Sequence, residues 1–163
     1  GSFAVASAGR FYDEAAALSR AVGRRAVLLT GQLGPPRRDG DCLIMNYAPH
    51  SAVFPRASAI VHHGGIGTTG QALRAGRPQI VVPHFGDQFD NAARLEANGV
   101  SATIHRDRFK ADQATSIVSH ILNDPVMADA ARRATTIIAR EDGAAKAARH
   151  IAALAVTSPL ANG

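Results

Sequence analysis

The sequence predicts an α/β fold, a doubly wound parallel sheet with helices on both faces, followed by a helical C-terminal extension. Short, uninterrupted apolar runs alternate with longer Ala- and Leu-rich stretches that have helical spacing. Apolar runs without alternation are typical of strands buried on both faces, and strands separated by helices pair in parallel. After residue 107 the strand-like runs stop and only helical stretches follow.

The expected elements begin with a helix over Tyr12–Val22, in which Ala15, Leu18 and Val22 share one face. A polar loop rich in proline and glycine is expected over 34–40. Four apolar runs each predict a buried strand: Ala26–Leu29, Leu43–Met45, Ala59–Val61 and Gln79–Val82.

A helix over Thr68–Ala75 is expected between the last two strands, with Gly76 and Pro78 as its stop signal. Three successive helices follow, over Asp112–Leu122, Asp124–Ala139 and Gly143–Ala155. We therefore expect one domain over residues 1–156 and a frayed tail over 157–163.

No strand-like run precedes the first helix, although the first strand of a doubly wound sheet is central. The chain opens with Gly1-Ser2-Phe3. Either Gly1-Ser2 is the remnant of a tag, or the strand and everything before it were removed or belong to another chain. Both interpretations make the sequence part of a larger protein.

The composition is that of a soluble globular domain, with 46% apolar and 19% charged residues in 163. No apolar run approaches the roughly 20 residues that a transmembrane helix needs, and no signal peptide is visible. The single cysteine, Cys42, excludes an intrachain disulfide and a cysteine-built metal site. These features favour a cytoplasmic location.

The net charge of +5 does not indicate nucleic-acid binding. The basic residues are scattered arginines that cluster only in pairs, such as Arg37-Arg38, whereas nucleic-acid patches contain longer basic runs. Aromatic residues on which bases could stack are also few, with two Tyr, six Phe and no Trp. We expect no nucleic-acid partner.

The chemistry is concentrated where the third expected strand ends. His62-His63 is followed by Gly64-Gly65-Ile66-Gly67 and by a helix that begins near Thr68-Thr69. Glycines allow a ligand to approach the backbone, and a helix N-terminus offers unpaired N–H groups and the positive end of a dipole. The segment therefore predicts an anion site, most naturally for phosphate.

The fourth strand leads through Pro83-His84 to Asp87-Gln88 at the same edge of the sheet. A carboxylate and an amide there could bind several hydroxyl groups. A phosphate site beside a hydroxyl-binding pair predicts a phosphorylated sugar as the ligand.

Two other readings of this segment are weaker. Gly65, Gly67 and Gly70 match the dinucleotide pattern, but no acid closes the next strand, which disfavours an oxidoreductase. Strand alternation directs His62 away from His63, so His62 is interpreted as structural and a shared metal ion is not expected.

The segment resembles the donor-binding, C-terminal half of family 1 glycosyltransferases with two Rossmann-like domains, the GT-B architecture. The sequence over Ile66–Leu73 is most similar to bacterial glycolipid rhamnosyltransferases and to sterol- or macrolide-type glycosyltransferases. The motifs that carry the resemblance are Gly1-Ser2, Tyr47-Ala48-Pro49-His50, His63 with Gly65, Gly67 and Thr68, Gly76-Arg77-Pro78, Pro83, Asp87-Gln88 and Asn91-Ala92.

The resemblance implies three groups of binding residues. Gln71 stands where many members have a glutamate that binds the ribose, which leaves UDP against dTDP open, and His50 stands where plant members have glutamine. The diphosphate would be held by His63, Gly65, Gly67, Thr68 and Ser2, the base and ribose by Tyr47, Ala48, Pro49, His50 and Gln71, and the sugar by Asp87 and Gln88.

The resemblance also implies an inverting transfer of a hexosyl group from a UDP- or dTDP-sugar to a hydroxyl of a lipid or natural product. No cofactor or metal is expected, and the general base would lie in an N-terminal acceptor domain that this sequence lacks. The isolated chain is thus expected to bind the donor weakly and to transfer no sugar. A non-catalytic nucleotide-sugar-binding or partner-docking module is the alternative, and an epimerase is a third, for which only Asp87 could serve as the acid or base.

Overall fold

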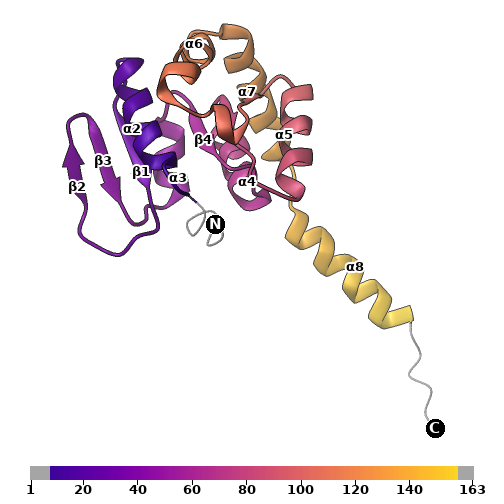
Figure 1. Cartoon of the computed structure of the whole chain (residues 1–163). Coiled ribbons are helices and arrows are strands. Elements are labelled where there is room, and N and C mark those ends of the chain that lie inside the picture. Colours follow the sequence, from indigo (N-terminus) through magenta and orange to yellow (C-terminus); the bar gives the residue numbers. More distant parts are fainter. Residues whose placement is uncertain (1–7, 158–163) are drawn as a thin grey trace.

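The computed structural model describes residues 8–157, with side chains to residue 154 (Figure 1). The strands are β1 (Ala26–Leu29), β2 (Arg37–Asp39), β3 (Cys42–Met45), β4 (Ile60–His62), β5 (Gln79–Val81) and β6 (Ser101–Thr103). The helices are α2 (Phe11–Ala21), α3 (His50–Val53), α4 (Ile66–Ala75), α5 (Asp87–Ala97), α6 (Ala111–Leu122), α7 (Pro125–Ile138) and α8 (Gly143–Thr157), with 3-10 turns η1 (Phe54–Arg56) and η2 (Arg106–Arg108).

The strands form two three-stranded groups, in the orders β1-β3-β2 and β4-β5-β6. The pairs β1–β3, β4–β5 and β5–β6 are parallel. Within residues 8–157, β1 and β4 each have one edge without a neighbouring strand. A doubly wound sheet has its first strand at the centre, and no such strand lies within residues 8–157.

Helix α2 joins the two groups of strands. Its Leu18 packs in one core with Ile80 of β5, and its Ala16 packs in another with Leu28 of β1 and Cys42 of β3. Because α2 contributes apolar side chains to both cores, their burial under this one helix holds the two groups of strands together.

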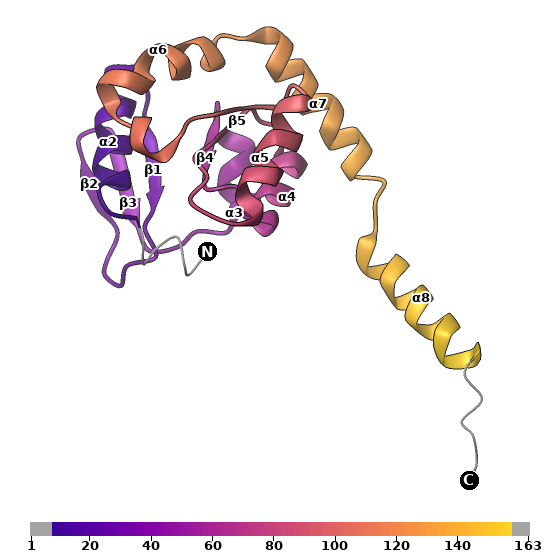
Figure 2. The same cartoon turned by 45° about the vertical axis from the view of Figure 1, so that its right-hand side comes forward.

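Helices cover both faces of the β4-β5-β6 group (Figure 2). Ile80 packs toward α2 and α6, and its neighbour Val81 packs toward Ala92 and Leu95 of α5. The predicted α/β class, with parallel strands, helices on both faces and a helical C-terminal segment, is thus confirmed. Helix α8 extends away from the body, and no helix in the described range is long and apolar enough to cross a membrane.

Two strands were not predicted. Arg37–Asp39 lies in the expected loop but forms β2, because its backbone pairs antiparallel with β3 while its charged side chains stay exposed at the edge. Ser101–Thr103 forms β6 through its ladder with β5, although small and polar residues hide the strand from an apolar pattern. The predicted helices are found with ends shifted by at most two residues.

Candidate functional site

The turn between β4 and α4 requires a glycine at position 64. Gly64 has a φ of +87°, a conformation that side-chain-bearing residues rarely adopt. A Cβ atom there would lie 2.9 Å from Val81 Cγ1 and 3.1 Å from the backbone oxygen of Gln88. Both the backbone angle and the space around it exclude any larger residue.

His63 lies against the next glycine. A Cβ atom on Gly65 would fall 2.5 Å from Nε2 of His63, so the bare backbone of Gly65 makes room for the imidazole. Partial burial lowers the pKa of His63, and the Asp87 carboxylate opposes that shift. A neutral His63 at pH 7 can still donate one N–H to an anion.

Helix α4 begins at this turn with its first amides available. No side chain caps its N-terminus, and the first backbone bond back to the turn runs from the Thr69 amide to the Gly65 oxygen, at 3.0 Å. The space beside Gly67 is open, with nothing within 4 Å of a built Cβ. The hydroxyl of Thr69 is buried without a hydrogen-bond partner among the described residues, while Thr68 is half-buried. The turn therefore gathers N–H donors in the arrangement that an anion requires.

Asp87 and Gln88 lie at the start of α5, close to the same turn. Asp87 is exposed and its Oδ2 accepts a hydrogen bond from Asn91 Nδ2 at 3.1 Å. Gln88 is buried, and its Oε1 accepts from the backbone amides of His84, at 2.8 Å, and Phe85, at 3.3 Å. Gln88 therefore orders the loop before α5 with its oxygen, which leaves only its amide nitrogen for a ligand.

The Tyr47–His50 segment leads into α3. Tyr47 is 68% exposed, as a platform for a planar ring would be, whereas Ala48 is buried. Pro49 precedes the first turn of α3, and the His50 ring stacks on Phe54 with 4.4 Å between centroids. Gln71 is exposed on α4. The remaining predicted binding residue, Ser2, lies outside the described residues.

His62 has the structural role that strand alternation indicates. It is 6% exposed, its Nε2 lies 2.8 Å from Gln79 Oε1, and its Nδ1 accepts the Gly64 amide at 3.0 Å. The sequence alone predicts no contact for Gln79 or Asn91. Asn91 stood out only as part of the resemblance, and Gln79 is recognisable as a partner only once the strand register is known.

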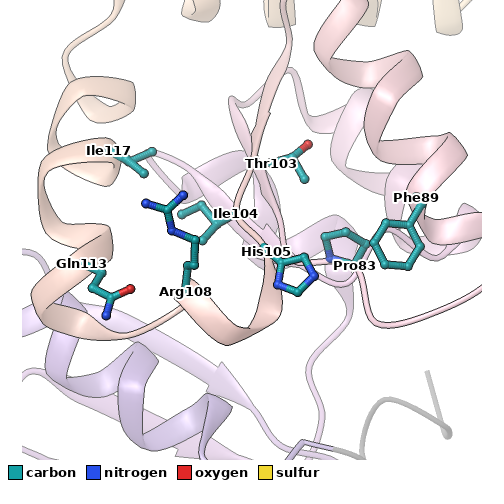
Figure 3. A pocket seen from close by; sticks show the side chains of 8 residues that line it. All are labelled: Pro83, Phe89, Thr103, Ile104, His105, Arg108, Gln113 and Ile117. Carbon is teal, nitrogen blue, oxygen red and sulfur yellow. The ribbon is translucent and has the colours of Figure 1, made fainter.

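Two hollows lie elsewhere on the molecule. One of about 380 Å³ lies at the ends of β5 and β6, where Pro83 and Ile104 contribute apolar surface and Arg108 a guanidinium (Figure 3). The other, of about 300 Å³, lies beside the start of α2. Neither is lined by the turn at residues 63–69. Residues 8–157 contain no group of three or more side chains that could together hold a metal ion.

The fold is shared with solved glycosyltransferase structures. The kitacinnamycin glycosyltransferase superposes with a TM-score of 0.74 and 25% identity, over 86% of this chain and 38% of that one. The glycosyltransferase SnogD from Streptomyces nogalater gives 0.64 and 28%, over 85% and 39%. The fold therefore places the molecule in the class of GT-B glycosyltransferase domains.

Sequence comparison identifies the family within that class. Residues 39–154 match the family model described as erythromycin biosynthesis protein CIII-like, C-terminal domain. The chain belongs to this family of glycosyltransferase C-terminal domains.

Curated relatives come from natural-product and sterol glycosylation. The O-mycaminosyltylonolide 6-deoxyallosyltransferase of Streptomyces fradiae is 39% identical over 80% of this chain and 31% of its own length. The vancomycin aglycone glucosyltransferase of Amycolatopsis orientalis is 39% identical over 80% and 32%. A sterol 3-beta-glucosyltransferase of Candida albicans is 41% identical over 63% and 7%. The chain thus spans about a third of the length of the first two relatives.

Proposed function

We propose that this domain binds the nucleotide diphosphate sugar donor, a UDP- or dTDP-hexose, of an inverting glycosyltransferase. The observation that carries the proposal is the turn at residues 63–69, where His63, two bare glycine positions and uncapped helix amides converge. A diphosphate needs such a concentration of N–H donors. The donor is a substrate here, and the proposal requires no cofactor.

The turn would act on the leaving group. As the bond from the sugar to the diphosphate breaks, negative charge grows on the phosphate oxygens. His63, Thr68 and the first amides of α4 would stabilise that charge by hydrogen bonds, which would lower the barrier without a proton transfer by this domain. Asp87, at the start of α5, would bind the sugar hydroxyls, and Tyr47 with Gln71 would face the nucleoside.

The general base that deprotonates the acceptor hydroxyl is proposed to lie in a separate N-terminal acceptor domain. Within the described residues, His63 and Asp87 interact electrostatically but share no hydrogen bond, so His63 lacks the carboxylate contact that orients a histidine base. The chain alone is expected to bind donor and transfer no sugar. The names of the relatives favour a natural product or a sterol-like lipid as the acceptor.

A calorimetric titration tests the role of His63. We expect His63→Ala to weaken UDP or dTDP binding by about tenfold to a hundredfold, because a hydrogen bond to a charged group contributes roughly 1.5–3 kcal/mol. His105→Ala is the matched control, since His105 also follows a strand end but is exposed and lies at the 380 Å³ hollow. Equal affinities of parent and His63→Ala would remove His63 from the site.

A further inference from the structure

Gly64 is held from both sides by side chains. Its amide donates to Nδ1 of His62 at 3.0 Å, and its carbonyl oxygen accepts from Nδ2 of Asn91 at 2.9 Å. The two contacts come from different elements, the end of β4 and the second turn of α5. These two contacts form a clamp, with His62 as its first arm and Asn91 as its second. The residue they hold has a positive φ that sets the direction of the following chain.

The first arm of this clamp has one possible arrangement of protons. Because Nδ1 of His62 accepts the Gly64 amide, the ring proton must be on Nε2, which then donates to Gln79 Oε1 at 2.8 Å. That bond also determines which way the Gln79 amide points, because a flipped amide would place an N–H against the ring N–H. His62 is 6% exposed and Gln79 is fully buried, so water does not compete for either contact.

The second arm connects the turn to the proposed sugar-binding side. The same Asn91 nitrogen that donates to Gly64 also donates to Asp87 Oδ2 at 3.1 Å. Asp87 in turn acts electrostatically on His63. The turn, the asparagine and the carboxylate therefore form one continuous network.

We propose that His62 and Asn91 are positioning residues that clamp Gly64. They thereby hold His63 and the first amides of α4 in the orientation that binds the diphosphate. The role of the clamp in binding rests on the proposed function, whereas the clamp itself is a property of the turn. Neither residue needs to touch the ligand. A small rotation at Gly64 would move every donor that follows it, which is why holding both its amide and its carbonyl matters.

The test compares variants that keep or remove each contact. His62→Asn retains an acceptor near the position of Nδ1, and His62→Leu removes it. Asn91→Ala removes the second arm. Its matched control is Asn98→Ala, because Asn98 lies at the end of the same helix and its side chain donates to the Arg94 oxygen at 2.8 Å, away from the turn. Val118→Ala serves as a control for lost core packing far from the turn.

Two readouts are measured on the whole chain: exchange of the Gly64 amide hydrogen and the affinity for UDP. In His62→Leu we expect exchange to be at least about tenfold faster and affinity about tenfold lower. His62→Asn should restore most of both. Asn91→Ala should weaken UDP binding several-fold while Asn98→Ala leaves it unchanged. If His62→Leu does not fold, the two asparagine variants decide the proposal.

Three results would overturn the clamp. Parental UDP affinity in folded His62→Leu is one, and equal loss in Asn91→Ala and Asn98→Ala is another. The third is an equal loss of affinity in Val118→Ala at matched global stability, which would reduce His62 to ordinary core packing. Should the parent bind no UDP, the proposed function fails, and Gly64 exchange in His62→Leu against His62→Asn still decides whether the clamp exists.

Discussion

Burial keeps the imidazole of His62 uncharged near neutral pH. Desolvation lowers its pKa from 6.5 to about 4, although the hydrogen bond to Gln79 partly opposes the shift. Protonation would also destroy the acceptor on Nδ1 that holds Gly64. The fold therefore depends on the neutral form of this residue.

This depression predicts how stability depends on pH. Between about pH 6.5 and 4 the unfolded chain binds a proton at His62 that the folded chain does not, so stability falls as pH falls through that window, by up to roughly 3 kcal/mol. Urea unfolding of the parent and of His62→Asn at pH 7 and 4.5 measures it. The variant should lose less stability than the parent, while His105→Asn, at an exposed site, should follow the parent. Identical losses in parent and His62→Asn would contradict the assignment.

For single residues, the sequence predicts that His62 has a structural role but not which residues it contacts. Alternation along a strand indicates that His62 and His63 point to opposite sides, and His62 is indeed buried. That Gln79 accepts the hydrogen bond from the ring N–H depends on the register of β4 on β5, which pairs His62 with Val81 and so places Gln79 two residues away on the same face. Such a register depends on tertiary packing and is invisible to a local pattern.

The first turn of α4 separates the needs of folding from those of binding. Gly67 and Gly70 both lie inside the helix with ordinary backbone angles, so neither is required by conformation. A Cβ at Gly67 meets nothing within 4 Å, and one at Gly70 meets only the Arg74 guanidinium at 3.9 Å. Glycine inside a helix costs up to about 1 kcal/mol relative to alanine. Neither glycine is explained by folding, and for Gly67, in the first turn, we propose close approach of a ligand.

Gly67→Ala and Gly70→Ala therefore form a matched pair. Both should raise the free energy of unfolding, by a few tenths to about 1 kcal/mol. Only Gly67→Ala should weaken UDP binding, because its methyl group would stand where the diphosphate approaches the amides. Urea unfolding and calorimetry of both variants measure the two effects. Unchanged affinity in Gly67→Ala would argue against a ligand at this turn.

The sequence placed the start of this helix at Thr68, whereas α4 begins at Ile66. Low helix propensity makes glycine a sign of a loop, and here packing and the preceding turn override it. The same limit applies to β2, whose three residues are all exposed and form a strand only through their backbone pairing with β3.

At the scale of the whole molecule, one edge of β1 and one edge of β4 have no neighbouring strand within residues 8–157. Val27 of β1 and Val61 of β4 are 43% and 36% exposed, although parallel strands normally bury such residues on both faces. In the doubly wound order the first strand lies between two such edges. The backbone groups of Ile60 and His62 form hydrogen bonds on the side of β5. Those of Val61 therefore face the other edge of β4. The strand order of doubly wound sheets predicts a central first strand from the sequence alone. The packing of α2 against both groups of strands cannot be predicted from a local pattern.

A designed strand tests that place directly. A short Val- and Thr-rich segment fused ahead of Gly1 should slow exchange of the Val61 amide and raise the melting temperature by a few degrees, since pairing and burial are both gained. A Gly-Ser segment of equal length is the control. Slow exchange of the Val61 amide in the unfused chain, or no difference between the two fusions, would show that no added strand pairs with the edge of β4.

The central claim is that the turn at residues 63–69 binds a diphosphate, and amide chemical-shift mapping of the chain titrated with UDP tests it most directly. We predict the largest shifts at the amides of Gly65, Ile66, Gly67 and Thr68, with smaller ones near Asp87. Shifts concentrated instead around His105 and Arg108, at the hollow of Figure 3, with the turn unmoved, would contradict it.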